Sequence, residues 1–100
     1  MADKTVTFYA RKIRDHFMVK GVSSVEYVDF EPPDQVGFEG DIAARFGHKQ
    51  AGNAVIRAAV LYLEKRDEIY VHREPEDNRS EQGSQGQPYP ARVQCTVTLR

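Results

Sequence analysis

Apolar residues recur at the spacing of an amphipathic helix across residues 3–20. Charged residues occupy the positions between them, and Gly21 follows at a point where a helix ends readily. Five apolar side chains then share one face: Val6, Tyr9, Ala10, Ile13 and Phe17. The pattern predicts a first helix that packs on a core through this face and exposes its charged side to water.

A strand is predicted next. Residues 25–30, with the sequence VEYVDF, are rich in β-branched and aromatic side chains, which favour extended backbone. Pro32 and Pro33 end the strand because proline has no amide donor and restricts the residue before it. Residues 31–40 are therefore predicted to form a loop, in which the glycines of GFEG at 37–40 form turns.

A short helix and a turn are predicted between residues 41 and 52. Asp41 is expected to be the N-cap, because an aspartate carboxylate accepts hydrogen bonds from the first amides of a helix. Three apolar residues lie on one side of this helix: Ile42, Ala43 and Phe46. Gly47 then ends the helix, and the sequence HKQAG at 48–52 forms the turn.

A longer helix, from about residue 53 to 66, leads into a strand with almost no linker. Four of its apolar residues are expected in the core: Ile56, Ala59, Val60 and Leu63. Residues 68–73 then alternate apolar and polar side chains, as a strand does. The last strand, about residues 92–99, has an apolar row that includes Cys95 and is predicted to pair with residues 68–73 as an antiparallel hairpin.

The run from Leu63 to Ile69, LEKRDEI, stands where the longer helix passes into the strand. It resembles the run L-E-x-x-x-x-I that closes the recognition helix and opens the wing in winged helix-turn-helix DNA-binding domains of prokaryotic regulators. The resemblance covers residues 41–73, with Asp67 in place of the family's usual glycine and a turn longer than the family's commonest form.

This resemblance implies one α+β domain over residues 1–100 of winged helix-turn-helix type. The implied order of elements is helix, strand, helix, helix, strand, strand. Residues 74–91 would form a long wing loop between the last two strands. This stretch is rich in Asn, Ser, Gly, Gln and Pro, and its apolar residues follow no helix or strand period.

The resemblance also implies binding of duplex DNA, with the first turn of the longer helix at the base edges and the wing beside it. Asn and Gln side chains would pair with adenine there, Arg with guanine, and Lys with phosphates. The implied DNA-binding residues are Arg45, His48, Lys49, Gln50, Asn53, Arg57, Arg73, Arg79 and Arg92. We expect a transcriptional regulator or an accessory factor of replication or partition, and a homodimer that pairs through the first helix and the apolar residues Phe8, Met18 and Val19.

Two features leave other interpretations open. The longer helix is apolar nearly all round, and such a helix is typically buried on more than one side. Its alanines would nevertheless permit close approach to DNA. Alternatively, Leu61 and Tyr62 could pack on a second subunit. The stretch from Glu26 to Asp41 is acidic and contains no Lys or Arg. Its apolar residues either anchor a protein partner or cap the core, and they are Tyr27, Phe30, Val36 and Phe38. The alternatives are a protein-interaction module that uses this acidic face, and an α+β structural subunit without nucleic acid.

Composition and motifs narrow the choice of function. The net charge of −1 means that any binding of nucleic acid depends on local cationic residues and on salt. Cys95 is the single cysteine, so one chain forms no disulfide and no cysteine-based zinc cluster, and the three histidines are far apart in sequence. Without a phosphate-binding glycine loop either, we expect no enzyme activity, no cofactor and no metal. The pattern of a signal peptide or a membrane span is missing, so we expect a cytoplasmic protein with no membrane partner.

Overall fold

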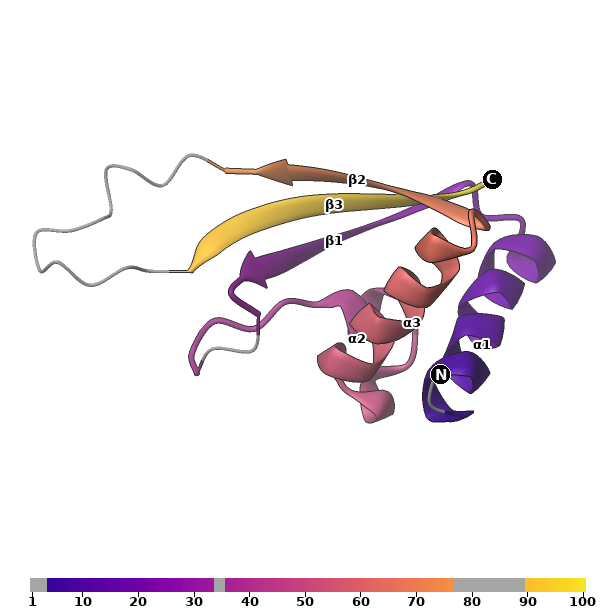
Figure 1. Cartoon of the computed structure of the whole chain (residues 1–100), viewed down its shortest axis with the longest axis horizontal. Coiled ribbons are helices and arrows are strands. Elements are labelled where there is room, and N and C mark those ends of the chain that lie inside the picture. Colours follow the sequence, from indigo (N-terminus) through magenta and orange to yellow (C-terminus); the bar gives the residue numbers. More distant parts are fainter. Residues whose placement is uncertain (1–3, 34–35, 77–89) are drawn as a thin grey trace, which may run out of the picture.

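The chain folds as an α+β structure with helices on one face of an antiparallel sheet (Figure 1). The structure is a computed structural model and describes residues 4–33, 36–76 and 90–100. The elements are α1 (Lys4–Lys20), β1 (Ser24–Glu31), α2 (Ile42–Arg45), the 3₁₀ turn η1 (Lys49–Ala51), α3 (Asn53–Lys65), β2 (Ile69–Pro75) and β3 (Ala91–Leu99). The predicted order of helices and strands is therefore observed, with η1 added inside the predicted turn. Most of the predicted wing loop, together with Arg79, lies outside the described residues.

The sheet has the order β1-β3-β2, with β3 in the centre and both neighbours antiparallel to it. The predicted hairpin is confirmed, because Val71 on β2 is paired with Val97 on β3. The same Val97 is paired with Val25 on β1, a pairing that the sequence pattern did not indicate. Strands far apart along the chain thus meet on the central strand.

The core lies between the helices and the inner face of the sheet, and Phe46 is at its centre. The Phe46 ring is 1% exposed. It makes ring contacts with Phe17 of α1 at 6.1 Å and with Tyr27 of β1 at 6.4 Å. The predicted core positions of α1 and α3 that are buried around it are Ala10, Ile13, Phe17, Ile56, Ala59, Val60 and Leu63.

The apolar row of β3 enters the core for only part of its length. Cys95 and Val97 are buried, so the thiol packs as a small hydrophobe, as expected. Val93 at the start of the row is buried as well, whereas Leu99, the last residue of the strand, is 38% exposed. Burial also raises the pKa of the Cys95 thiol, so the thiol stays protonated at neutral pH.

Asp41 occupies the N-cap position of α2, as predicted, but its side chain makes no capping hydrogen bond to the helix, so the expected role of the carboxylate was wrong. Its amide donates to the carbonyl oxygen of Val28 at 3.1 Å, and its Oδ1 accepts from the amide of Val28 at 2.7 Å. Its Oδ2 accepts from Nε of Arg45 at 2.9 Å. Asp41 therefore pairs with the open edge of β1, and this pairing sets where α2 begins.

Gly40 makes this approach to β1 possible. A Cβ atom at position 40 would run into the carbonyl oxygen of Val28 and would also crowd Asp29. Only a residue without a side chain lets the backbone come this close to the strand. The glycine that we expected merely to form a turn is thus a packing requirement.

Asp67 ends the turn between α3 and β2 in the left-handed conformation, with φ 59°. The amide of Asp67 donates to the carbonyl of Glu64 at 3.0 Å, and the amide of Glu68 donates to that of Leu63 at 3.0 Å. These two bonds form a Schellman C-cap, in which glycine is the usual residue at this position. Aspartate tolerates the left-handed region better than most residues, so Asp67 supplies the geometry of a glycine here.

Replacing Phe46 by alanine is expected to lower the free energy of unfolding by about 3–5 kcal/mol, because a buried ring is lost and a cavity remains. The matched control is Phe8→Ala, since the Phe8 ring is 53% exposed. Its removal is expected to cost about 1 kcal/mol or less. Urea unfolding followed by circular dichroism measures both, and equal losses would contradict the central role of Phe46.

Candidate functional site

The residues predicted to contact DNA are spread over five elements. Arg45, His48, Lys49 and Gln50 lie on α2 and the turn after it, and Asn53 and Arg57 lie on α3. Arg73 is on β2 and Arg92 is on β3. Their side chains divide into those held by other parts of the chain and those directed to solvent.

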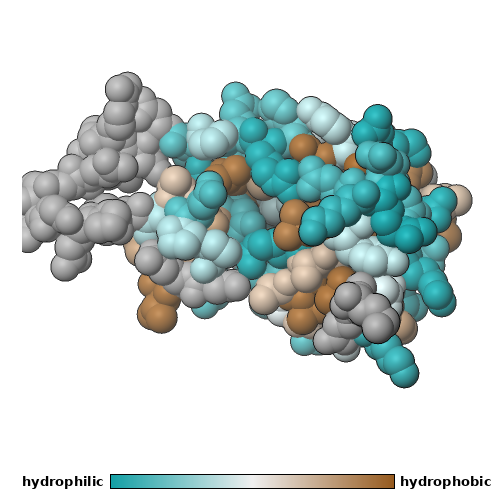
Figure 2. Space-filling model, viewed as in Figure 1, coloured by the Kyte–Doolittle hydropathy of each residue, from teal (hydrophilic) through white to brown (hydrophobic). Residues whose placement is uncertain are grey.

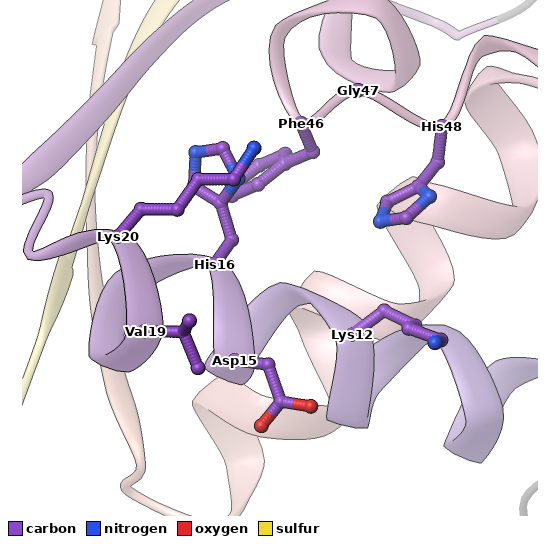
Figure 3. A pocket seen from close by; sticks show the side chains of 8 residues that line it. All are labelled: Lys12, Asp15, His16, Val19, Lys20, Phe46, Gly47 and His48. Atoms are coloured by element: carbon purple, nitrogen blue, oxygen red, sulfur yellow. The ribbon is translucent and has the colours of Figure 1, made fainter.

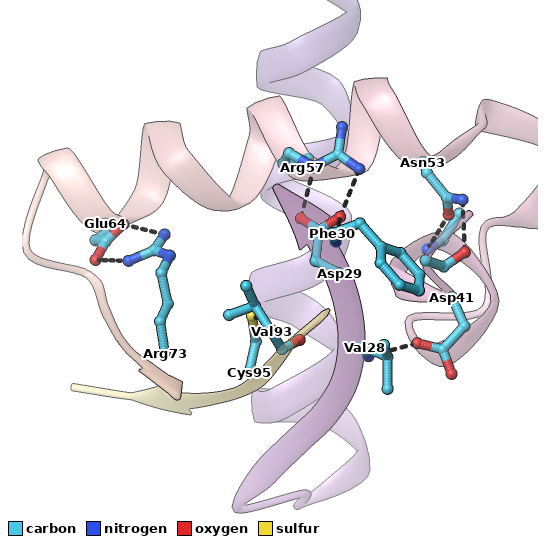
Figure 4. Close-up of polar contacts among 12 residues, drawn as sticks. Val28, Asp29, Phe30, Asp41, Asn53, Arg57, Glu64, Arg73, Val93 and Cys95 are labelled. Carbon is cyan, nitrogen blue, oxygen red and sulfur yellow. Dashed lines mark hydrogen bonds and ion pairs between the residues drawn. The ribbon is translucent and has the colours of Figure 1, made fainter. Parts of the chain in front are cut away.

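Asn53 is held inside the chain. Its Oδ1 accepts from the amide of Ala43 at 3.1 Å, and its Nδ2 donates to the carbonyl oxygen of Gly40 at 2.7 Å (Figure 4). The side chain thus joins the start of α3 to the start of α2 and satisfies an amide of a residue that is 2% exposed. Reading of a base by Asn53 would require both bonds to break.

Arg57 forms a bidentate ion pair with Asp29 of β1. Its Nε donates to Oδ2 at 2.7 Å and its Nη2 donates to Oδ1 at 2.8 Å (Figure 4). The two side chains are only 17% and 15% exposed. Asp29 also accepts from the amide of Phe30 at 2.9 Å. The guanidinium expected at a guanine is therefore an attachment between α3 and the sheet.

Arg73 forms a second bidentate pair, with Glu64 of α3, at 2.8 and 2.9 Å. Hydrogen bonds from Arg73 lower the pKa of the Glu64 carboxyl, more than burial raises it. Arg73 therefore faces α3 and not the wing. Because Glu64 follows Arg57 by two helical turns, one side of α3 is attached to β1 and to β2.

Arg45 and Arg92, the other predicted arginines within the described residues, are paired nearer the surface. Arg45 Nε lies 2.9 Å from Asp41 Oδ2, and Arg92 Nε lies 3.3 Å from Glu76 Oε1. In the described ranges, each arginine except Arg11 has a carboxylate partner, and the paired set is Arg14, Arg45, Arg57, Arg66, Arg73, Arg92 and Arg100. Lysine side chains in the same ranges form no such pair.

Lys49 and Gln50 are the predicted residues that remain directed to solvent without a partner from the described parts of the chain. Both are exposed on η1, immediately before α3. Lys49 also lines an open hollow of about 630 Å³ at the starts of α2 and α3. The carboxylates of Glu39 and Asp41 line the same hollow, so its lining carries more negative than positive charge.

The exposed strip of α3 is apolar along most of its length. Ala54 and Leu61 are exposed, Ala58 is half-buried between them, and Lys65 ends the strip. Figure 2 shows apolar side chains gathered over this helix within a largely hydrophilic face. The helix thus has an accessible side, but that side lacks the amide and guanidinium groups that read bases.

A second hollow, of about 280 Å³, lies between α1 and the turn after α2 (Figure 3). His48 lines it, and its ring meets Tyr9 edge-on at 5.4 Å. His16 of α1 lines the same hollow and meets Phe46 edge-on at 5.9 Å. Two histidines that are distant in sequence are therefore brought to one place, which the spacing of residues did not reveal.

Both histidines are disfavoured in their charged form. Burial is the main cause of the lowered pKa of His16, followed by Lys20 and His48. Burial is also the main cause for the pKa of His48, followed by Lys12 and Lys20. Near neutral pH the two rings are thus largely uncharged, and the hollow gains positive charge as the solution becomes acidic.

The acidic stretch contains three aromatic residues, Tyr27, Phe30 and Phe38, and none of them is exposed. Tyr27 is 3% exposed, and burial raises the pKa of its hydroxyl group. Phe30 is half-buried and meets Phe38 edge-on at 5.8 Å. Tyr27 therefore belongs to the core, whereas Phe30 and Phe38 pack on each other.

The described ranges contain no group of three or more His, Cys, Asp or Glu side chains placed to hold a metal ion. Within those ranges no helix has the length and apolar character needed to cross a bilayer. No protein-family model, curated protein or solved structure matches this chain.

Arg57→Ala is expected to lower the free energy of unfolding by roughly 2–3 kcal/mol, because Asp29 would keep a half-buried charge without its partner. Arg45→Ala is the matched control: its pair with Asp41 has side chains 61% and 35% exposed, so a loss of about 0.5 kcal/mol is expected. Chemical denaturation of the two variants gives the comparison. An Arg57 variant as stable as the Arg45 variant would refute a structural role for the buried pair.

Stability is expected to fall as the pH drops below about 6.5, the ordinary histidine value. The folded state lowers the pKa of His16 and His48. The unfolded chain therefore takes up protons at a higher pH than the folded chain does, and acidification stabilises the unfolded state relative to the folded state. The free energy of unfolding, measured between about pH 7.5 and pH 5, should depend less on pH in the double variant His16→Gln/His48→Gln. An unchanged dependence would show that these rings are not responsible.

Proposed function

We propose that the chain is a small DNA-binding protein of winged helix-turn-helix type, which holds duplex DNA against η1 and the start of α3. The order of elements agrees with that expectation, and so does the left-handed Asp67, which supplies the geometry of the family's glycine between α3 and β2. The proposal extends to a cytoplasmic transcriptional regulator or an accessory factor of replication or partition.

The observation that carries the proposal is that the side chains of Lys49 and Gln50 are exposed and have no partner from the described parts of the chain. These side chains stand exposed on the turn before α3, at the place where a helix-turn-helix meets DNA. Lys49 would contact a phosphate, and Gln50 would reach a base edge or a second phosphate. The methyl groups of Ala54 and Ala58 would let α3 approach thymine methyl groups closely.

The internal use of arginine limits what this surface can do. Arg57 and Arg73 are attached to carboxylates, so few cationic groups near α3 are available for phosphates. DNA binding should therefore show little preference for base sequence, and its affinity should depend strongly on salt concentration. A homodimer through the exposed Phe8, Met18 and Val19 would add a second half-site and raise affinity without new base contacts.

A second candidate function is docking of a protein partner on the apolar strip of α3. Leu61 is 40% exposed and lies next to the half-buried Ala58 and Tyr62. A strip of this kind suits an apolar partner surface better than a polar groove. In this case Leu61→Glu would abolish partner binding, whereas a change at Lys49 would not.

Lys49→Glu is expected to weaken binding of a random-sequence duplex and to lower the slope of log affinity against log salt by about one, the value for one lost phosphate contact. Lys65→Glu is the matched control, because Lys65 is also exposed and forms no ion pair in the described ranges but lies at the far end of α3. Fluorescence anisotropy over a salt series measures both. Equal effects of the two changes, or no binding by the unaltered protein at low salt, would refute this proposal.

A further inference from the structure

Positive charge without a carboxylate partner gathers on α1 and the turn beside it. In the part of the chain that the structure describes, six cationic side chains form no ion pair: Lys4, Arg11, Lys12, Lys20, Lys49 and Lys65. The first four belong to α1, and Lys49 follows directly after His48. The uncompensated charge therefore lies mainly on α1, away from the exposed strip of α3.

The hollow of about 280 Å³ between α1 and the turn opens within this charged region. Lys12, His16 and Lys20 are spaced four residues apart on α1, so they form one row along the helix. His48 and Gly47 lie across from this row, as Figure 3 shows. Four nitrogen-bearing side chains thus surround one space and come from two separate elements.

The floor of the hollow is apolar and fixed. The His16 ring is backed by Phe46, which is 1% exposed, and the His48 ring is backed by Tyr9. Partial burial of the rings reduces screening by water, so a bound anion would interact more strongly here than on open surface. Asp15 is the one carboxylate among the lining residues, and in Figure 3 it points away from both rings.

We infer that this hollow is a binding site for a phosphate group, held by the ammonium groups of Lys12 and Lys20 and by N–H donors of His16 and His48. A phosphate offers several acceptor oxygens and a negative charge, which suits two lysines and two imidazoles that line one space from two elements. The Lys12 ammonium, which lies 5.3 Å from the centroid of the Phe8 ring, would turn from that ring to the anion. The group is either free phosphate or a phosphodiester of a nucleic acid. This site does not depend on DNA contact at η1.

The histidines make the site sensitive to pH. The charged and titratable groups around them come from α1 and the turn, and they are Tyr9, Lys12, Asp15, His16, Lys20 and His48. The lysines disfavour protonation of the rings in the empty site, whereas a bound anion favours it. Anion binding therefore takes up protons and becomes tighter as the pH falls through the histidine range.

The test is a titration of the 100-residue chain with inorganic phosphate at constant ionic strength. NMR signals of the histidine rings and backbone amides are recorded at each phosphate concentration. Sulfate is titrated in parallel, because its charge does not change between about pH 5.5 and pH 7.5. We expect saturable shifts at His16, Gly47 and His48, with sulfate binding several-fold tighter at the lower pH. Shifts that fail to saturate, or that avoid both histidines, would overturn the inference.

Three variants test which side chains hold the anion. Lys12→Gln and Lys20→Gln should each weaken phosphate binding several-fold, since each removes one ammonium group from the hollow. Lys4→Gln is the control, because Lys4 is an unpaired lysine of α1 that does not line the hollow. Equal weakening in all three would show general attraction to a charged helix and would refute a built site.

A short DNA duplex then identifies the source of the phosphate group. Displacement of inorganic phosphate from His16 and His48 by the duplex would support the site and assign it to the nucleic-acid backbone. Retention of phosphate in the presence of the duplex would support the site for free phosphate alone. A duplex that shifts Lys49 and Gln50 while phosphate fails to bind would refute this site and leave the proposed function standing.

Discussion

The position of α3 depends on two bidentate ion pairs that attach one side of it to both outer strands. Arg57 binds Asp29 on β1, and Glu64 binds Arg73 on β2. The apolar side chains beneath α3 hold the helix on the core, but the hydrophobic effect itself has no direction. Planar groups that meet through two hydrogen bonds each allow far less rotation. The pairs thus fix which strip of α3 faces solvent.

This attachment has a consequence for where charge is available. Guanidinium groups suit half-buried bidentate pairs better than ammonium groups do, so arginines form the internal connections while lysines remain hydrated at the surface. In the described ranges Arg11 is the exception to this division, and the unpaired charge lies mostly on α1. The element that a helix-turn-helix would place in a groove is therefore poorer in free cations than the helix behind it.

The sequence predicted the elements well because helix and strand periods are local properties. Ile56, Ala59, Val60 and Leu63 recur at helical spacing, and these side chains are buried as expected. Pairing of β1 with β3 joins distant segments, and no local pattern encodes it. Asp41 shows the same limit of local patterns. An aspartate before a helix is a typical N-cap residue in the sequence, but the sequence does not tell whether its carboxylate binds the helix or, as here, a neighbouring strand.

The candidate site was predicted less well for the same physical reason. A charged residue on a predicted helix is expected in solvent, and only the fold reveals that Arg57 meets Asp29. The proximity of His16 to His48 gave no signal in the sequence, because their common hollow exists only after α1 packs against the turn. Asn53 was expected to read bases, yet it joins two helix starts because both of its amide atoms find backbone partners there.

The short segment from Phe46 to Lys49 connects the two surfaces. Phe46 fixes it to the core, His48 faces α1 and the smaller hollow, and Lys49 faces the larger hollow at the start of α3. A phosphate held beside His48 would therefore lie next to the residue that leads into α3. If the same duplex met both surfaces, protonation of the two histidines would strengthen its attachment through the backbone alone, so acidification would raise affinity without changing base preference.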